Sequence, residues 1–224
     1  MDIIKALQEE LKIGRNQAEA AIKLIDEGNT IPFIARYRKE VTGALNDEVL
    51  RVLDERLRYL RNLEEKKEQV LSSIQEQEKL TPELERQIQE AATLVAVEDL
   101  YRPYRPKRRT RATIAQEKGL GPLADMIALQ MTKEPLENLA KAYISEEKGV
   151  SDAKEAIAGA GDILAERISD EAKYRTHIRD VTMKQGTLQS MAKNEKEESV
   201  YEMYYNYEET IRKAVGHRIL ALNR

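Results

Sequence analysis

Apolar residues recur every three or four positions through most of the chain, the spacing of helices with one buried face. The pattern predicts a first helix over 3–11, broken by Gly14, and a second over 18–25 that ends at Gly28-Asn29. Both residues suit the left-handed conformation that closes helices. Two short helices joined by a glycine turn fit a DNA-reading helix-turn-helix, but a plain helical hairpin packed on the core is the favoured interpretation.

A basic connector is expected over 30–43, and a long helix from Asn46 to about residue 79. Asn46 can cap this helix, and acidic residues follow in its first turn, where they suit the helix dipole. Its leucine seam is interrupted over 64–69, which is more than one turn without an apolar residue. A helix that is polar all round usually bridges separate packing regions. We interpret it as a spine, about 50 Å long at 1.5 Å per residue.

Start signals predict the later helices. Thr81-Pro82-Glu83 combines an N-cap, a proline at the first helical position and an early acid. Thr113 with Gln116 matches a capping box, and Gly121-Pro122 starts another helix. Further helices are expected over 135–143, 151–168 and 170–184. The second of these contains a stretch of alanine and glycine that permits close helix packing.

A tyrosine-rich segment follows a charged loop over 193–199. Its tyrosines are expected mostly on a helix with Ile211 and Val215, and they are Tyr201, Tyr204, Tyr205 and Tyr207. Stacking on bases is one interpretation of these rings. Packing against a neighbouring element is favoured, because helical tyrosines commonly bury the ring and leave the hydroxyl in water.

The composition fits a helical protein and excludes several chemistries. The chain has 224 residues, 34 % of them charged, with a net charge of −3 and few aromatic residues. The absence of cysteine excludes disulfides, thiolate metal sites and cysteine nucleophiles. The N-terminus lacks the pattern of a signal peptide, and no stretch approaches the roughly 20 apolar residues of a membrane span. We therefore expect an all-α, multi-helical, soluble and cytoplasmic protein with one long central helix.

One segment departs from the finely mixed charges of the rest. Residues 101–111 read Tyr-Arg-Pro-Tyr-Arg-Pro-Lys-Arg-Arg-Thr-Arg, with no acidic residue. Its prolines favour an extended loop, and arginine offers a rigid donor fork that grips two phosphate oxygens. The candidate nucleic-acid-binding residues are Arg102, Arg105, Lys107, Arg108, Arg109 and Arg111, with Arg36, Arg38 and Lys39 as weaker candidates. The alternatives are ion pairs with acidic helices of this chain or a partner, or no role.

No catalytic centre is expected. The two histidines, His177 and His217, lie far apart and outside any metal-ligand spacing. No nucleophile elbow, phosphate-binding loop or dinucleotide fingerprint occurs. The many carboxylates alternate with lysine and arginine along helices, which is typical of solvated faces. We expect neither an enzyme activity nor a cofactor or metal.

Three segments resemble signatures of one family. Residues 28–40, Gly-Asn-Thr-Ile-Pro-Phe-Ile-Ala-Arg-Tyr-Arg-Lys-Glu, look like a signature of the bacterial Tex family of transcription accessory proteins. Residues 97–120, which include the basic loop, and residues 217–224 resemble two more. The three follow the family's order from one end of the chain to the other.

The resemblance implies an architecture and a role. Tex proteins are several times longer and continue into a YqgF domain, helix-hairpin-helix elements and an S1 domain. They are associated with RNA polymerase and nucleic acid. The resemblance implies a helical N-terminal region with a long central helix and a helix-turn-helix-like module, which we place at about 121–187.

The residue pattern and this resemblance together divide the chain into four segments. We expect a hairpin and connector (1–45), a spine (46–80), a helical region (81–200) and a tyrosine-rich helix (201–224) that leads to an absent YqgF domain. Without the S1 domain, nucleic-acid binding is expected to be weak and without sequence preference. The alternative is a scaffold that docks RNA polymerase or the rest of Tex without touching nucleic acid.

Overall fold

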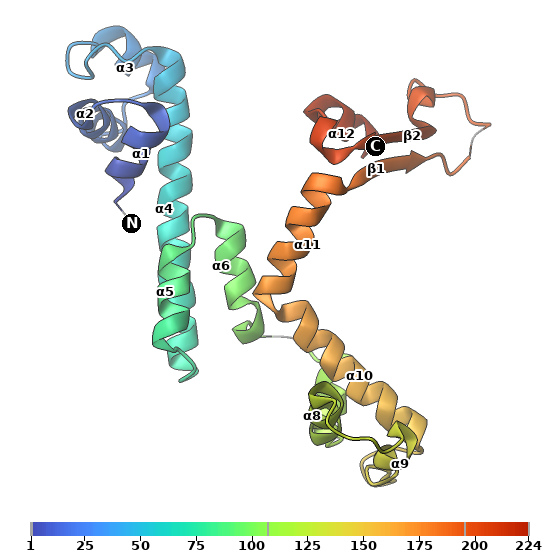
Figure 1. Cartoon of the computed structure of the whole chain (residues 1–224). Helices are drawn as coiled ribbons and strands as arrows, with labels where there is room; N and C mark the ends of the chain where they lie inside the picture. Colours follow the sequence, from blue (N-terminus) through green and yellow to red (C-terminus); the bar gives the residue numbers. More distant parts are fainter. Residues whose placement is uncertain (1, 107, 195, 224) are drawn as a thin grey trace. The chain divides into compact units, whose positions relative to one another are not determined.

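The computed structural model describes residues 2–106, 108–194 and 196–223 and is predominantly helical (Figure 1). The chain forms two compact units, Met1–Tyr101 (unit 1) and Arg102–Arg224 (unit 2). The predicted all-α, multi-helical fold with one long helix is confirmed. In the described ranges, a single two-stranded sheet is added to it. The finer division of the chain into four segments stays a prediction.

Unit 1 is built along one long helix. Its helices are α1 (Ile3–Leu11), α2 (Arg15–Asp26), α3 (Ile31–Tyr37), α4 (Asp47–Glu76), α5 (Pro82–Glu90) and α6 (Leu94–Tyr101). The helices α1 to α3 pack on the N-terminal half of α4, and α5 and α6 pack on its C-terminal half (Figure 1). As predicted, Asn46 caps α4, because its Oδ1 accepts a hydrogen bond from the Val49 amide at 2.8 Å.

The predicted apolar seam of α4 forms the core of unit 1. Its buried residues are Leu50, Leu53, Leu57, Leu60, Leu63, Val70 and Ile74. The polar interval over 64–69 also contributes a buried side chain, because Lys67 is only 4 % exposed. Its Nζ donates to Glu64 Oε1 at 2.9 Å and to the Gln89 carbonyl at 2.8 Å. This lysine therefore ties the middle of α4 to the end of α5.

The prediction of a connector over 30–43 is wrong for the first half of this range, which forms the helix α3. Pro32 lies in its first turn, where a missing N–H needs no partner, so the proline starts a helix here. The second half is a run of turns held by Thr42. The buried hydroxyl of Thr42 donates to the carbonyls of Arg38 and Lys39 at 3.2 and 3.4 Å.

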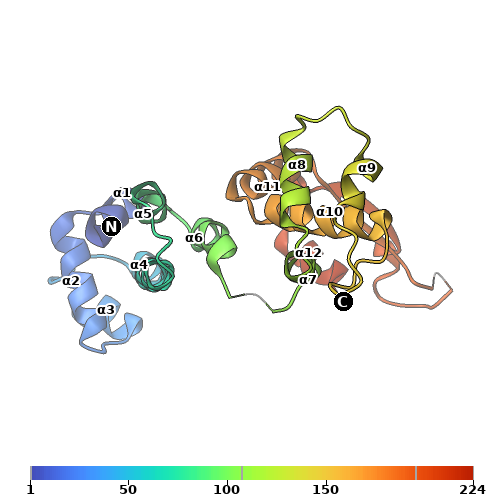
Figure 2. The same cartoon turned by 90° about the horizontal axis from the view of Figure 1, so that it is seen from below.

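Unit 2 begins with a bundle around one helix. Its elements are η1 (Arg102–Tyr104), α7 (Arg111–Glu117), α8 (Gly121–Leu129), α9 (Leu136–Lys141), α10 (Ala153–Asp170), α11 (Ala172–Gln185), β1 (Thr187–Met191), η2 (Glu202–Tyr204), β2 (Asn206–Thr210), η3 (Ile211–Lys213) and α12 (Gly216–Leu222). The helices α7, α8 and α9 pack against α10 (Figure 2). The helix-turn-helix-like part expected at about 121–187 covers α8 to α11 and stays a prediction.

Small side chains bring the helices of this bundle together. The core contains Ala112, Ala115, Ala124, Ala140, Ala156 and Ala160 beside a few larger residues. A Cβ atom added at Gly159 would lie 2.4 Å from Leu120 Cδ1 and 3.3 Å from Ala115 Cβ. Only glycine admits the buried Leu120 side chain at this distance, so the close packing expected from the small-residue stretch is confirmed.

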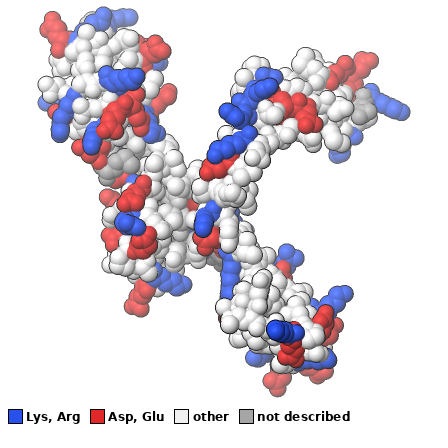
Figure 3. Space-filling model, viewed as in Figure 1, with Lys and Arg blue, Asp and Glu red and all other residues white. Residues whose placement is uncertain are grey.

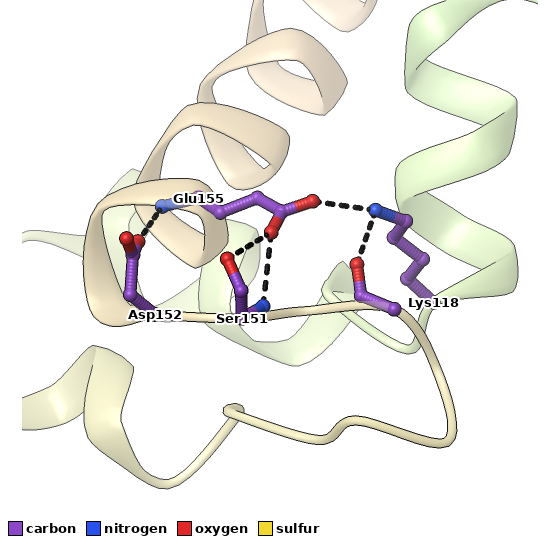
Figure 4. Close-up of polar contacts among 5 residues, drawn as sticks. Lys118, Ser151, Asp152 and Glu155 are labelled. Atoms are coloured by element: carbon purple, nitrogen blue, oxygen red, sulfur yellow. Dashed lines mark hydrogen bonds and ion pairs between the residues drawn. The ribbon is translucent and has the colours of Figure 1, made fainter.

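A polar cluster fixes the start of α10 to the end of α7 (Figure 4). Lys118 Nζ donates to the Gly149 carbonyl at 2.6 Å and to Glu155 Oε1 at 2.7 Å. The Ser151 amide and hydroxyl donate to Glu155 Oε2 at 2.9 and 2.8 Å. The bond from Lys118, followed by those from Ser151, lowers the pKa of Glu155 to about 2. The lowered pKa therefore keeps Glu155 a carboxylate at acidic pH values below 4.5.

Two predictions for unit 2 are wrong. The capping box at the start of α7 lies three residues earlier than expected, because Thr110 Oγ1 accepts from the Thr113 amide at 3.0 Å. The tyrosine-rich segment is not an α-helix, because the short 3-10 helix η2 is followed by the strand β2. This strand pairs antiparallel with β1, with Thr187 opposite Thr210 and Met191 opposite Asn206. Pairing with a strand 15 or more residues away supplies hydrogen bonds that local spacing does not reveal.

No described helix combines the length and apolarity needed to cross a membrane. On the face of unit 1 that Figure 3 shows, lysine and arginine alternate with aspartate and glutamate. This finely mixed surface agrees with the sequence pattern.

Candidate nucleic-acid interface

Tyr101, the first residue of the segment predicted over 101–111, ends α6, and we call residues 102–111 of unit 2 the basic loop. It begins as the 3-10 turn η1, so the expected extended conformation is wrong for Arg102–Tyr104. The described residues that follow, 105–106 and 108–109, belong to no helix or strand, and Thr110 is the N-cap of α7. Lys107, one of the candidate residues, lies outside the described residues.

The loop and the two helices α7 and α10 line an open pocket of about 590 Å³. Four arginines at intervals of three residues line it from the loop: Arg102, Arg105, Arg108 and Arg111. Three acids at intervals of four residues line it from α10: Asp162, Glu166 and Asp170. Residues four apart share one face of a helix. The pocket is therefore a row of guanidinium groups opposite a row of carboxylates.

Arg102 is fixed by the most buried of these acids. Its Nε donates to Asp170 Oδ1 at 2.9 Å, and Asp170 is buried at the last residue of α10. A carboxylate at a helix C-terminus faces the negative end of the helix dipole, so it needs a cation beside it. Arg102 thus anchors the loop to α10.

Two further loop arginines are paired more loosely. Arg109 Nη2 lies 2.8 Å from Glu117 Oε2, and both side chains are exposed. Arg111 Nε lies 3.7 Å from Asp162 Oδ1, and Arg111 is 87 % exposed. Exposed pairs of this kind contribute only about 0–1 kcal/mol, so a phosphate can replace either carboxylate.

Arg105 and Arg108 are the loop arginines best placed for an external anion. Both are exposed and line the pocket, and neither has a carboxylate within ion-pair distance among the described residues. The predicted site therefore separates into an anchor, two loosely paired residues and two available guanidinium groups. Ion pairing within the chain, one of the alternatives, occurs for Arg102, Arg109 and Arg111.

The weaker candidates form a set of their own in unit 1. Arg36 lies on α3, Arg38 and Lys39 follow it, and all three are exposed. Arg38 Cζ lies 5.3 Å from the centre of the Phe33 ring, and Arg36 Cζ lies 6.0 Å from that of Tyr37.

Sequence reasoning missed the acidic wall of the pocket and the two aromatic rings of α3. The spacing of Asp162, Glu166 and Asp170 is visible in the sequence, but it is also that of an ordinary solvated face. Phe33 and Tyr37 are four residues apart, as on one face of a helix, and this signal was hidden by the expectation of a connector. Within the described residues, no group of three or more histidine, aspartate or glutamate side chains can hold a metal ion.

Two family models match the chain on either side of the basic loop. The model described as Tex-like protein N-terminal domain matches residues 1–75, and the model described as Tex central region-like matches residues 130–224. The chain belongs to the Tex family. The recognition drawn from the three signatures is thus confirmed, and the loop lies in the interval between the two matched ranges.

Curated relatives extend this result along the whole chain. An uncharacterized protein YdcI of Bacillus subtilis is 48 % identical over 221 residues, which cover 97 % of this chain and 31 % of that protein. The transcriptional accessory protein Tex of Neisseria gonorrhoeae is 44 % identical over 226 residues, covering 100 % of this chain and 30 % of that protein. The human S1 RNA-binding domain-containing protein 1 is 29 % identical over 233 residues, covering 100 % and 23 %. The chain spans about 30 % of the length of these two bacterial relatives.

Proposed function

We propose that the basic loop makes auxiliary contacts with the backbone of nucleic acid, as part of the helical N-terminal region of a Tex transcription accessory protein. The observation that carries the proposal is the pair Arg105 and Arg108, exposed in the pocket without a carboxylate partner among the described residues. The names of two relatives, a transcriptional accessory protein and an S1 RNA-binding domain-containing protein, fit this role.

The contacts are expected to carry no sequence preference. Guanidinium groups grip phosphate oxygens, which are the same in every nucleotide, and phosphate contacts position a protein without reading bases. Arg102 remains on Asp170 and holds the loop in place. Arg109 and Arg111 exchange their carboxylate partners, Glu117 and Asp162, for phosphates. Binding is therefore weak and depends steeply on salt.

The test compares two charge-matched double variants. Arg105→Gln/Arg108→Gln removes the two available loop arginines. Arg58→Gln/Arg86→Gln removes two exposed arginines of unit 1 that are paired with Asp54 and Glu83. Affinity for a fluorescent 20-nucleotide RNA is measured by anisotropy over a series of salt concentrations.

The loop variant should reduce the slope of log K against log salt by about 1.4, since each phosphate contact on a single strand contributes about 0.7. The control should keep the slope of the unchanged protein. An unchanged slope in the loop variant refutes the proposal.

A second function, protein docking, is favoured by one observation on α11. This helix buries none of its residues among the described ones, and Tyr174, Ile178 and Val181 are exposed on it at helical spacing. Such a face fits a scaffold for RNA polymerase or for further parts of a longer Tex protein. Ile178→Ser should then abolish binding to purified RNA polymerase and leave the salt slope for RNA unchanged. Retained polymerase binding excludes this face as the docking surface.

A further inference from the structure

The arginines of unit 1 differ sharply in their partners. Six of them lie within 2.9 Å of a carboxylate oxygen: Arg15, Arg51, Arg56, Arg58, Arg61 and Arg86. The remaining two, Arg36 and Arg38, have no carboxylate partner among the described residues. In a unit whose other arginines are closely paired, these two neighbouring guanidinium groups stay available to an external anion.

These two guanidinium groups lie beside two exposed aromatic rings. Phe33 is 36 % and Tyr37 61 % exposed, and their ring centres are 5.3 Å apart at an interplanar angle of 47°. Arg38 lies over Phe33, and Arg36 lies near Tyr37. We call Phe33, Arg36, Tyr37, Arg38 and Lys39 the α3 patch.

The backbone under the α3 patch is firmly held. Ile34 is fully buried and anchors α3 in the core of unit 1. After the helix, the buried Thr42 hydroxyl donates to the carbonyls of Arg38 and Lys39, and Gln17 Nε2 donates to the Gly43 carbonyl at 2.8 Å. The exposed rings are therefore presented on a fixed surface.

We propose that the α3 patch binds single-stranded nucleic acid, with an unpaired base stacked on the Tyr37 ring and neighbouring phosphates held by Arg36, Arg38 and Lys39. Proteins that bind single strands without sequence preference combine these two elements, aromatic platforms and cations along the backbone. The inference deepens the proposed nucleic-acid role and rests on it for the class of ligand. It does not depend on the basic loop.

Charge and shape favour a single strand over other occupants. An unpaired nucleotide offers a flat π-face and a phosphate together, and thus satisfies both the ring and the guanidinium groups. A duplex keeps its base faces stacked inside, so it engages the cations alone. An acidic peptide without aromatic residues also engages only the cations.

The first test places a reporter in the patch. The chain has no tryptophan, so Tyr37→Trp creates a protein with a single indole at the proposed stacking position. Tyr174→Trp places the matched control on another half-exposed tyrosine, on α11 of unit 2. The probes are a 12-nucleotide oligouridylate, a 12-base-pair duplex and polyglutamate, each at low salt.

Oligouridylate should quench the fluorescence of Trp at position 37 in a saturable way, while duplex and polyglutamate leave it nearly unchanged. The control at position 174 should stay unquenched. Equal quenching at position 37 by duplex or by polyglutamate overturns the inference, and so does the absence of quenching.

The second test measures affinity. Tyr37→Leu should weaken binding of oligouridylate at least about fivefold, because one stacked base contributes about 1 kcal/mol or more. Tyr37→Phe keeps the ring and should retain the affinity of the unchanged protein. Arg36→Gln/Arg38→Gln should weaken binding more than the charge-matched Arg58→Gln/Arg86→Gln. Equal affinities for the Leu and Phe variants overturn stacking at this position.

Repeating the Tyr37→Trp titration in the Arg105→Gln/Arg108→Gln background separates this inference from the loop proposal. Quenching that persists in this background supports the α3 patch, even if the loop substitutions leave the slope of log K against log salt unchanged. If the tryptophan at position 37 is not quenched and the loop substitutions reduce the slope of log K against log salt, the α3 patch is overturned. The basic loop then remains as the contact.

Discussion

The two units of this Tex chain differ in the size of the side chains that pack their longest helices against the neighbouring helices. In unit 1, the long helix α4 presents a row of leucines to the helices on either side. In unit 2, α10 presents Ala156 and Ala160 to its neighbours and needs a glycine where Leu120 approaches. A core of long side chains is sensitive to cavities, whereas a core of small ones is sensitive to added volume. The same helical class thus has two different weak points.

The units also differ in how they use arginine. In unit 1, the arginines pair with carboxylates except beside the aromatic rings of α3. In the basic loop of unit 2, only Arg102 has a buried partner, and the others are loosely paired or available. The difference separates arginines that stabilise a surface from those that remain open to a ligand.

The largest expected effect is a cavity in the core of unit 1. Leu53→Ala should lower the free energy of unfolding by about 2–5 kcal/mol, because Leu53 is fully buried and its neighbours relax only in part. Urea denaturation followed by circular dichroism measures the loss, and hydrogen exchange on α4 assigns it to unit 1. Val52→Ala, at the exposed neighbouring position, is the control and should change stability by less than about 0.5 kcal/mol. Equal effects at both positions would show that the seam is not the core.

Unit 2 should respond to added volume, and two glycines of one helix provide the test. Gly159→Ala should cost about 1–2 kcal/mol, because its Cβ collides with the buried Leu120 side chain and the gain in helix propensity offsets only part of the strain. Gly161→Ala meets no atom within 4 Å. It should stabilise the protein by about 0.5–1 kcal/mol. Thermal unfolding measures both, and the same sign at both sites contradicts the packing account.

Local signals were sufficient where an element is defined by its own residues. The start of α4 followed from Asn46 and the acids after it, and its core followed from the leucine spacing. The start of α5 followed from Thr81 and Pro82. In each case the cap directly precedes the helix and the buried face lies on it, so the sequence of that segment contains the information.

Local sequence signals failed where an element or a side chain depends on a partner that is distant in the chain. Strand β2 forms because β1 supplies its hydrogen bonds, and the tyrosines of this segment gave a helical pattern instead. The spacing of the acids on α10 is that of a solvated helix face. In the structure, however, Asp170 pairs with Arg102 and Asp162 lies opposite Arg111. For the candidate site, the sequence predicted which residues are basic. The structure was needed to separate anchored arginines from available ones.

A smaller effect is expected at the polar cluster of unit 2, and it depends on pH. The pKa of Glu155 is lowered from 4.5 to about 2, so its carboxylate stabilises the fold at pH values above about 4.5. This contribution is lost as the pH falls from 4.5 toward 2. Glu155→Gln should therefore lower the melting temperature at pH 7, by less than Gly159→Ala does, and the deficit should vanish near pH 2. Differential scanning fluorimetry of both proteins from pH 2 to 7 measures it, and a deficit independent of pH contradicts the ionic origin.

The smallest expected effect concerns the acidic wall opposite the basic loop. Asp162→Asn removes the loose partner of Arg111 and should raise affinity for RNA about two- to threefold, since an exposed pair contributes less than about 1 kcal/mol. Asp125→Asn removes the same charge from the pair with Arg167, and neither of these two residues lines the pocket. Because Arg167 does not line the pocket, this control should raise the affinity for RNA less than Asp162→Asn does. Equal gains from both variants would trace the effect to net charge, and only a gain confined to Asp162 shows that α10 competes with phosphate for the loop.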